Sequence, residues 1–194
     1  MKHTIRRLIV TVGILTCGVG IPSAKAIEIG AGGGVISPWK GEDGFSVLGQ
    51  LMGSTKSGHW RFGGEFEYRD YSSEFFGVKD IDVESYQIRA LVHYLFAPDA
   101  FITPYIGLGI GISVNVIDKD KIERAKPFVD VFNKTGVSGG GVALLGLELP
   151  LGDHFAFFGE GRVGVDVQLT STEGDIDTEN LGGVGGIGGI RFRF

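Results

Sequence analysis

The chain has 194 residues, of which 18 are Lys or Arg, 23 are Asp or Glu and 34 are glycine, and it contains a single cysteine. The excess of acidic residues argues against a nucleic acid as partner, since surfaces that bind nucleic acids are rich in Lys and Arg. One cysteine cannot build a disulfide scaffold, so stability must come from the fold. Glycine is more than twice as frequent as the ~7% norm but follows no G-X-Y period, which excludes collagen and favours a β-fold with one face kept small.

The first 26 residues have the pattern of a secretory signal peptide. Basic residues at positions 2, 6 and 7 precede an apolar run over residues 8–21, and a small-x-small cleavage site ends at Ala26. The apolar run is too short to cross about 30 Å of hydrocarbon as a helix. Cleavage removes four of the basic residues, the cysteine and no acid, which leaves a net charge of −9 on residues 27–194. These residues show no linker or change in composition, so we predict one domain.

Eight segments of the predicted mature chain alternate between apolar residues and small or polar ones, which is the pattern of a β-strand with different environments on its two faces. The fifth segment is the clearest, because apolar residues occupy every second position from Ile106 to Val116, with Gly, Ser and Asn between them. The segments span residues 27–37, 45–54, 59–71, 83–96, 101–117, 137–151, 154–170 and 180–194. After residue 26 no apolar run approaches the ~20 residues of a membrane helix, so a membrane would have to be crossed by strands.

The connections alternate between long polar loops and tight turns. The predicted loops are residues 38–44, 72–82, 118–136 and 171–179, and the turns are 55–58, 97–100 and 152–153. This alternation puts all long loops on one side of the sheet. Aromatic residues are expected to mark a membrane interface on each side. They are Trp60, Phe96, Phe101, Phe155 and Phe194 on the short side, and Trp39, Tyr68, Tyr71 and Tyr86 on the long side.

The chain ends inside its last predicted strand on an aromatic residue. Ile190, Phe192 and Phe194 share one face while Arg191 and Arg193 share the other, which is the apolar-out, polar-in alternation of a membrane strand. Together with residues 104–109 (Pro-Tyr-Ile-Gly-Leu-Gly) and 159–162 (Gly-Glu-Gly-Arg), this ending resembles the small OmpA-like, opacity-type outer-membrane β-barrels of Gram-negative bacteria.

The resemblance implies an all-β fold, an eight-stranded antiparallel transmembrane up-and-down β-barrel over residues 27–194. It implies an outer-membrane location with both termini in the periplasm and the long loops outside the cell. In the family the terminal Phe belongs to a signal read by the barrel-assembly machinery, so Phe192 and Phe194 are the predicted assembly signal. The expected partners are this machinery, outer-membrane lipid and lipopolysaccharide, and an extracellular ligand held by the loops.

Periodicity does not say which face lies inside. A soluble barrel of the lipocalin type would turn the branched apolar face inward. We expect the opposite, because inward glycines in a narrow barrel make room for charged side chains. The predicted lumen then collects charges at Arg61, Glu65, Glu67, Arg69, Arg89, Glu148, Glu160, Arg162, Asp166, Arg191 and Arg193. Two interpretations stay open, a salt-bridged plug that fills the lumen and a narrow ion path.

The function expected from these features is a non-enzymatic, structural or surface-interacting (adhesin-like) role, with a narrow porin or diffusion channel as the alternative. No cofactor is predicted, and the histidines do not stand at a spacing that resembles the His-x-Ser of outer-membrane deacylases. The segment 171–179 carries four acids, which are either hard ligands for Ca²⁺ or part of a solvated loop. They are Glu173, Asp175, Asp177 and Glu179.

Overall fold

The computed structural model describes residues 26–75, 78–117, 135–172 and 175–194, and its regular elements are β-strands. They are β1 (Ala26–Pro38), β2 (Gly41–Ser54), β3 (Trp60–Phe75), β4 (Val78–Leu95), β5 (Thr103–Ile117), β6 (Thr135–Leu151), β7 (Phe155–Thr172), β8 (Asp175–Asn180) and β9 (Gly183–Arg193). The predicted signal peptide lies outside the described residues apart from Ala26. No helix in the described ranges has the length and apolarity to cross a bilayer.

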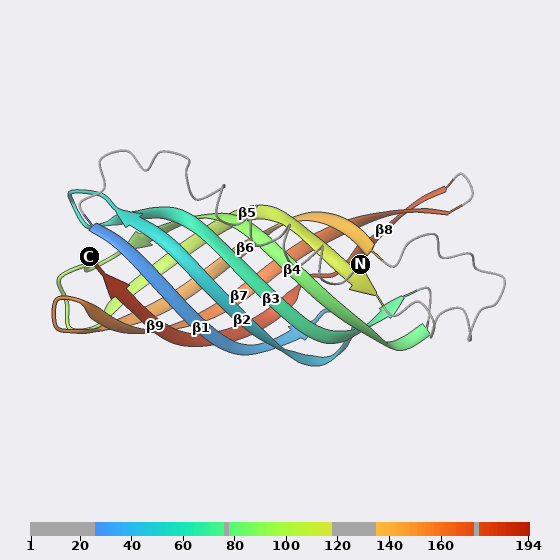
Figure 1. Cartoon of the computed structure of the whole chain (residues 1–194), viewed down its shortest axis with the longest axis horizontal. Coiled ribbons are helices and arrows are strands. Elements are labelled where there is room, and N and C mark those ends of the chain that lie inside the picture. Colours follow the sequence, from blue (N-terminus) through green and yellow to red (C-terminus); the bar gives the residue numbers. More distant parts are fainter. Residues whose placement is uncertain (1–25, 76–77, 118–134, 173–174) are drawn as a thin grey trace.

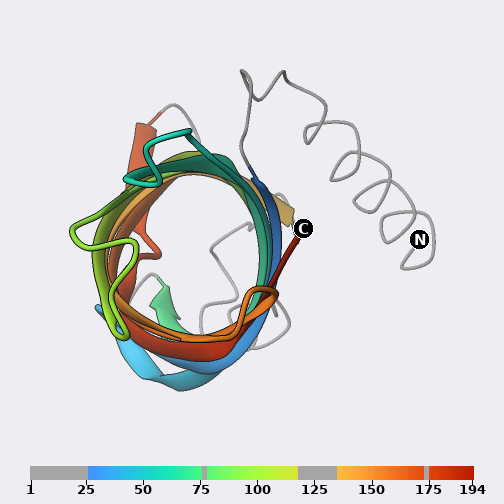
Figure 2. The same ribbon diagram turned by 90° about the vertical axis from the view of Figure 1, so that its left-hand side faces the viewer.

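The strands form one closed antiparallel sheet. Strands β1 to β7 pair consecutively, and β9 pairs with both β7 and β1 and so closes the ring. Eight strands, β1 to β7 with β9, therefore surround the barrel axis, while β8 stands outside the ring and pairs only with the far part of β7. A view down the axis shows the closed ring (Figure 2), and a side view shows the tilt of the strands (Figure 1). The predicted fold class is confirmed.

The tight turns lie at one end of the barrel, together with the start of β1 and the end of β9 (Figure 1). Two of these turns depend on glycine. Gly58 and Gly152 have φ angles of 75° and 78°, in the left-handed region that side chains with a Cβ disfavour. This end is called the short-turn end below, and the opposite end is the long-hairpin end.

At the long-hairpin end the strands run further than predicted. Segments 38–44, 72–82 and 171–179 are predicted as loops, but most of their residues belong to β1, β2, β3, β4, β7 and β8. The physical reason is that strand pairing uses the backbone, so a hairpin can continue where its side chains become polar. Polar residues show where the apolar alternation of a strand ends, but the strand itself continues beyond that point. Most of the predicted loop 118–136 lies outside the described residues.

The two faces of the sheet have opposite character. On β5, Ile110 lies on the outer face and is 73% exposed. Leu108 and Ile112 are also exposed on this face, and the positions between them point into the barrel. The outer face therefore carries branched apolar residues and the inner face carries most of the charge. A soluble lipocalin-type barrel has the reverse arrangement, which favours a barrel whose outer wall meets lipid.

The predicted aromatic residues fall mainly on the outer wall. All five of the short-turn set are exposed, and on the long side Tyr68 pairs across the strands with Tyr86, their ring centroids 5.2 Å apart. The prediction that Tyr71 marks the membrane interface is wrong, because Tyr71 is buried inside the barrel. It stands two positions after Arg69 and so shares the inner face with that residue.

Candidate functional site: a charged lumen

The eleven residues of the predicted charge cluster all lie on the inner face of the barrel. Ten are buried, and Arg193 at the short-turn end keeps 35% of its side chain exposed. Glu28 of β1 is a further buried acid that the sequence analysis omitted. Within the described residues the lumen thus holds six arginines and six carboxylates, and its formal charges balance.

Glu148 of β6 is the centre of the network at the short-turn end. Its two carboxylate oxygens accept hydrogen bonds from Arg61 of β3 at 2.6 and 2.9 Å, and Arg191 of β9 donates to Oε2 at 2.6 Å. Arg193 donates to Oε1 at 3.2 Å and to Glu28 Oε1 at 3.1 Å. The contacts of Glu148 join β6 to β3 and β9, which are not its neighbours in the ring, so they hold the walls together across the lumen.

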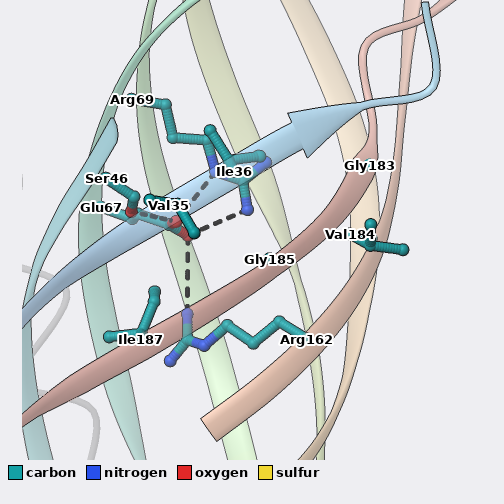
Figure 3. Close-up of a pocket in the computed structure, with 11 residues that line it drawn as sticks. Val35, Ile36, Ser46, Glu67, Arg69, Arg162, Gly183, Val184, Gly185 and Ile187 are labelled. Atoms are coloured by element: carbon teal, nitrogen blue, oxygen red, sulfur yellow. Dashed lines mark hydrogen bonds and ion pairs between the residues drawn. The ribbon is translucent and has the colours of Figure 1, made fainter. Parts of the chain in front are cut away.

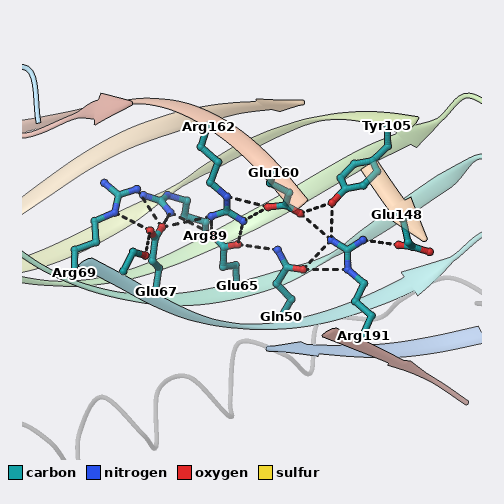
Figure 4. Close-up of polar contacts among 11 residues, drawn as sticks. Gln50, Glu65, Glu67, Arg69, Arg89, Tyr105, Glu148, Glu160, Arg162 and Arg191 are labelled. Atoms are coloured by element: carbon teal, nitrogen blue, oxygen red, sulfur yellow. Dashed lines mark hydrogen bonds and ion pairs between the residues drawn. The ribbon is translucent and has the colours of Figure 1, made fainter. Parts of the chain in front are cut away.

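Glu160 of β7 connects this group to the rest of the network. Its Oε1 accepts hydrogen bonds from the Tyr105 hydroxyl at 2.6 Å and from Arg191 Nη2 at 2.8 Å, and its Oε2 accepts one from Arg162 Nε at 2.9 Å. Figure 4 shows contacts that run from Glu148 through Arg191 and Glu160 to Arg162 without a break.

Arg162 carries the network on to two acids of β3. Glu65 accepts hydrogen bonds from Arg162 at 2.6 and 2.9 Å and from Arg89 Nη1 at 3.1 Å. Glu67 contacts Arg89 and accepts a hydrogen bond from Arg69 Nε at 2.8 Å. Arg89 thus lies against both carboxylates, with Glu65 as its register partner.

Asp166 of β7 is held more loosely. Gln87 donates to its Oδ2 at 3.2 Å, while Arg69 Nη1 and Arg89 Nη2 stand 3.5 and 3.8 Å from the same oxygen. These two nitrogens lack a hydrogen-bond partner among the described residues. The network is therefore tightest around Glu148, Glu160 and the two β3 acids and weakest around Asp166.

Arginine suits this lumen because its planar guanidinium has five donors and can bind two carboxylates at once. Arg162 and Arg191 each do so. Each of the twelve charges has an opposite charge within 4 Å, which offsets the large cost of taking it out of water. Removal of one partner would leave an uncompensated buried charge, at a cost of about 3–5 kcal/mol.

The inward glycines make room for these side chains. A Cβ atom at Gly146 would lie 2.2 Å from the Tyr105 ring. One at Gly111 would lie 2.0 Å from the backbone oxygen of Ile88 and 2.8 Å from Arg89 Cγ. Such separations are well below van der Waals contact. The neighbouring side chain therefore requires glycine at position 146, and backbone and side chain together require it at position 111.

Apolar and uncharged polar residues occupy the rest of the described lumen. Beyond the charges, toward the long-hairpin end, a buried apolar cap closes the interior, and the Tyr71 hydroxyl donates to the Leu181 carbonyl at 3.3 Å within it. The cap consists of Ile36, Tyr71, Ile81, Val83, Ile117 and Leu181. Three smaller clusters of buried apolar residues also lie inside the barrel.

One small cavity lies at the inner wall beside the charges. It forms where Gly183 and Gly185 bring no side chain to the wall, next to Glu67, Arg69 and Arg162 (Figure 3). Its volume is ≈ 10 Å³, which leaves room for about one water molecule. A cavity of this size offers no path for a hydrated ion.

Sequence reasoning omitted two residues that the network uses, Glu28 and Tyr105. Both were detectable by period two, since Glu28 shares a face with Gly30 and Gly32, and Tyr105 shares one with Gly107. Neither stands out as part of a charge cluster, because Tyr105 is uncharged and Glu28 is the one charged residue of segment 27–37. Gln50 of β2, which donates to Glu65 at 2.9 Å, carries no charge and gave no comparable signal.

The other predicted residues are placed as follows. Phe194 is exposed, its ring packs on Phe192 with centroids 4.6 Å apart, and its N–H donates to the Ile27 carbonyl of β1 at 2.9 Å. The last residue thus extends the seam between the first and last strands. Two histidines have structural partners, since His59 and His154 bond backbone carbonyls through Nδ1 at 2.9 and 3.1 Å.

The four acids of segment 171–179 are only partly described. Glu173 lies outside the described residues, and Asp175, Asp177 and Glu179 occupy alternate positions of β8. The Ca²⁺ site remains a prediction. In the described part of the chain no group of three His, Cys, Asp or Glu is placed to hold a metal.

No protein-family model matches the sequence, and comparison with curated proteins gives no match. Solved structures do match. Neisserial surface protein A superposes with a TM-score of 0.58 at 17% identity, over 87% of this chain and 96% of that one. Outer membrane protein OprG from Pseudomonas aeruginosa gives 0.64 at 12% identity, over 88% and 96%. The fold is that of the small outer-membrane β-barrels. At these identities the likeness concerns the fold, and function has to be argued from the barrel itself.

Proposed function

We propose that the chain is a non-enzymatic outer-membrane protein whose sealed barrel supports hairpins that act at the cell surface. The observation that carries the proposal is the filled lumen. Six arginines and six carboxylates bridge the walls, an apolar cap closes the long-hairpin end, and the cavity beside the charges has room for about one water molecule. A lumen packed in this way serves stability and shape, while interaction is left to the segments outside the barrel.

The outer wall supports a membrane location. Exposed branched residues cover the strands, and exposed aromatic rings such as Trp60, Phe101 and Phe155 gather at the short-turn end. In outer-membrane barrels short turns face the periplasm and long hairpins face outward. The proposed partners are therefore outer-membrane lipid, lipopolysaccharide and the barrel-assembly machinery, which would read Phe192 and Phe194 at the periplasmic end.

Protease treatment of intact cells tests display and orientation. Epitope tags with a protease site are inserted near Phe128 or Asp175, and in separate variants near Ser57 or Asp99. We expect added protease to cut the first pair and spare the second, with all four variants in the outer-membrane fraction. Cleavage at Ser57 and Asp99 in intact cells, or recovery of the protein in the periplasm, would contradict the proposal.

A narrow pore is the second candidate, and one observation favours it. Arg69 Nη1 and Arg89 Nη2 lack hydrogen-bond partners among the described residues, and Asp166 is held at long distances. Side chains that are held by few hydrogen bonds can change position, and such a change could open a path through the lumen. Swelling of protein-loaded liposomes in arabinose distinguishes the two candidates, because a sealed barrel gives the swelling rate of protein-free vesicles and a pore gives a faster one.

A further inference from the structure

His93 of β4 is a titratable residue of the lumen that the charge network does not use. Its side chain is completely buried, and neither Nδ1 nor Nε2 has a hydrogen-bond partner among the described residues. The other two histidines after residue 26, His59 and His154, each bond a backbone carbonyl through Nδ1. A buried polar group without a partner is uncommon in folded proteins and calls for an explanation.

The His93 ring is held in place by packing. It stacks on the Tyr105 ring of β5, with the two centroids 5.2 Å apart and 25° between the planes. His93 and Leu144 also cover Gly107 together, since a Cβ atom at position 107 would lie 2.6 Å from His93 Cδ2 and 2.8 Å from Leu144 Cδ1. The imidazole therefore cannot turn toward a new partner without displacing Tyr105 or Leu144.

Charged groups act on His93 from strands β3, β7 and β9, and most of them are cations. The described lumen already balances six arginines against six carboxylates, so a proton on His93 would be a seventh cation without a matching acid. Arg61 is the register partner of His93 on the adjacent strand. The charged groups whose fields reach the ring are Arg61, Glu160, Arg162 and Arg191.

The carboxylate of Glu160 has no position left for a further donor. Its Oε1 accepts hydrogen bonds from the Tyr105 hydroxyl and from Arg191 Nη2, and its Oε2 contacts both Nε and Nη2 of Arg162. A carboxylate oxygen has two lone pairs, so both oxygens are saturated. The Tyr105 oxygen is also engaged, because it accepts a hydrogen bond from Arg191 Nη2 at 3.2 Å.

Glu148, the other acid that holds Arg191, is saturated in the same way. Its Oε2 accepts hydrogen bonds from Arg61 Nη1 and Arg191 Nη1, and its Oε1 accepts them from Arg61 Nη2 and Arg193 Nη2. A protonated His93 would therefore have to displace an arginine from one of these acids or remain a buried charge without a partner. Both outcomes are costly.

We propose that His93 makes the short-turn end of the barrel sensitive to acid. The neutral imidazole fits the charge-balanced network. The imidazolium, formed by uptake of one proton from water, competes with Arg61 and Arg191 for Glu148 and Glu160 and loosens the contacts that join the walls. The inference rests on the lumen network and holds whatever molecules the hairpins bind.

The direction of the effect follows from proton linkage. In the unfolded chain a histidine takes up its proton near pH 6.5, and it is the side chain that ordinarily changes charge between pH 5 and 8. The folded lumen has no acceptor for this proton, so unfolding in acid is accompanied by proton uptake. The barrel therefore loses stability as the pH falls below about 6.5 and keeps it at higher pH.

The test compares the mature protein with His93→Gln and His93→Phe by urea unfolding in liposomes between pH 8 and pH 5. The amide of Gln has similar bulk without a titration in this range, and Phe keeps a ring to stack on Tyr105. From pH 8 to pH 5 the folding equilibrium constant of the wild type is expected to fall about ten- to thirtyfold more than that of either variant. Parallel pH profiles of the wild type and the variants would overturn the inference.

The matched control is His59→Gln combined with His154→Gln, which leaves His93 as the one histidine of the mature chain. Its equilibrium constants are expected to follow the wild-type profile within about twofold, since the control keeps the group that is proposed to respond. A pH profile of the control that matches the His93 variants would assign the response to the histidines of the turns and contradict the proposal.

Imidazole ¹⁵N chemical shifts of the same control protein in detergent micelles report the protonation state of His93 directly. We expect the signals of a neutral imidazole for as long as the barrel stays folded, with folding checked by heat-modifiable mobility on gels. An intact barrel in which this single histidine titrates near pH 6.5 would overturn the inference. This measurement decides the question even if neither His93 variant folds.

Discussion

At the scale of single residues, glycine has two different roles on the two faces of the same strands. Inside the barrel it yields space to a neighbour, as Gly146 does to Tyr105 and Gly111 to Arg89. On the outer wall a Cβ atom at Gly159 or Gly186 would meet nothing within 4 Å. The inner glycines are therefore part of the packing of the lumen, whereas these outer ones are not required by any described neighbour.

Alanine substitution should separate the two roles. Gly146→Ala is expected to destabilise the barrel by about 1–3 kcal/mol, because the new methyl group overlaps the Tyr105 ring and shifts it from Glu160. Gly159→Ala, on the same height of the outer wall, should change stability by less than about 0.5 kcal/mol and in the stabilising direction, since alanine restricts the unfolded chain. Urea unfolding in liposomes measures both. Equal effects at the two sites would show that Tyr105 has room to move.

Asp70 provides a prediction about pH. Partial burial, followed by the neighbouring Glu84 and Asp82, raises the pKa of Asp70 above its ordinary value of 3.8. A carboxyl group whose pKa is raised on folding reduces stability once pH exceeds that pKa, and this penalty disappears in acid when the group is protonated in both states. Asp70→Asn should therefore stabilise the barrel by roughly 0.2–0.5 kcal/mol at pH 7 and by nothing near pH 3. Unfolding midpoints at the two pH values check this, with Asp99→Asn in a tight turn of the short-turn end as the control. A gain of the same size at both pH values would contradict the electrostatic cause.

At the scale of strands, period two was sufficient to assign faces but not to predict partners or ends. The alternation predicts the outward side of β5 and the inward side of Arg61, Glu65 and Arg162. It cannot predict that Arg162 binds Glu65, 97 positions away, because that contact depends on the stagger of the whole ring. It also missed β8, because the polar residues of segment 171–179 indicate a loop although their backbone pairs as a strand. Tyr71, by contrast, follows from the period once Arg69 is placed inside.

The outward face of β5 and β7 yields a prediction for the membrane wall. Ile110→Arg or Val165→Arg places a cation where the account expects lipid near the midplane, and each is expected to cost about 2–4 kcal/mol. The matched controls are Ile110→Leu and Val165→Ile, which keep the wall apolar and should cost less than about 1 kcal/mol. Equilibrium folding into liposomes measures the differences. A cost within about 0.5 kcal/mol for both arginine variants would mean that the branched face meets water.

At the scale of the whole molecule, the barrel combines an apolar exterior, a charge-balanced interior and an acidic long-hairpin end. Six arginines tie the walls to six carboxylates, so the ring is held by contacts across the lumen as well as by its backbone ladder. The apolar cap then separates the charges from the long-hairpin end.

Single-channel current in planar lipid bilayers tests the central claim, that the lumen is sealed, most directly. Mature protein refolded in micelles is inserted into the bilayer, and insertion is verified by heat-modifiable protein recovered from the membrane. A porin of known conductance serves as the positive control in the same lipid. The account predicts no current steps above the protein-free bilayer in either voltage polarity, because the charge network and the apolar cap pack the described part of the lumen. Stable, repeated conductance steps from the intact barrel would contradict the sealed lumen and favour the narrow pore.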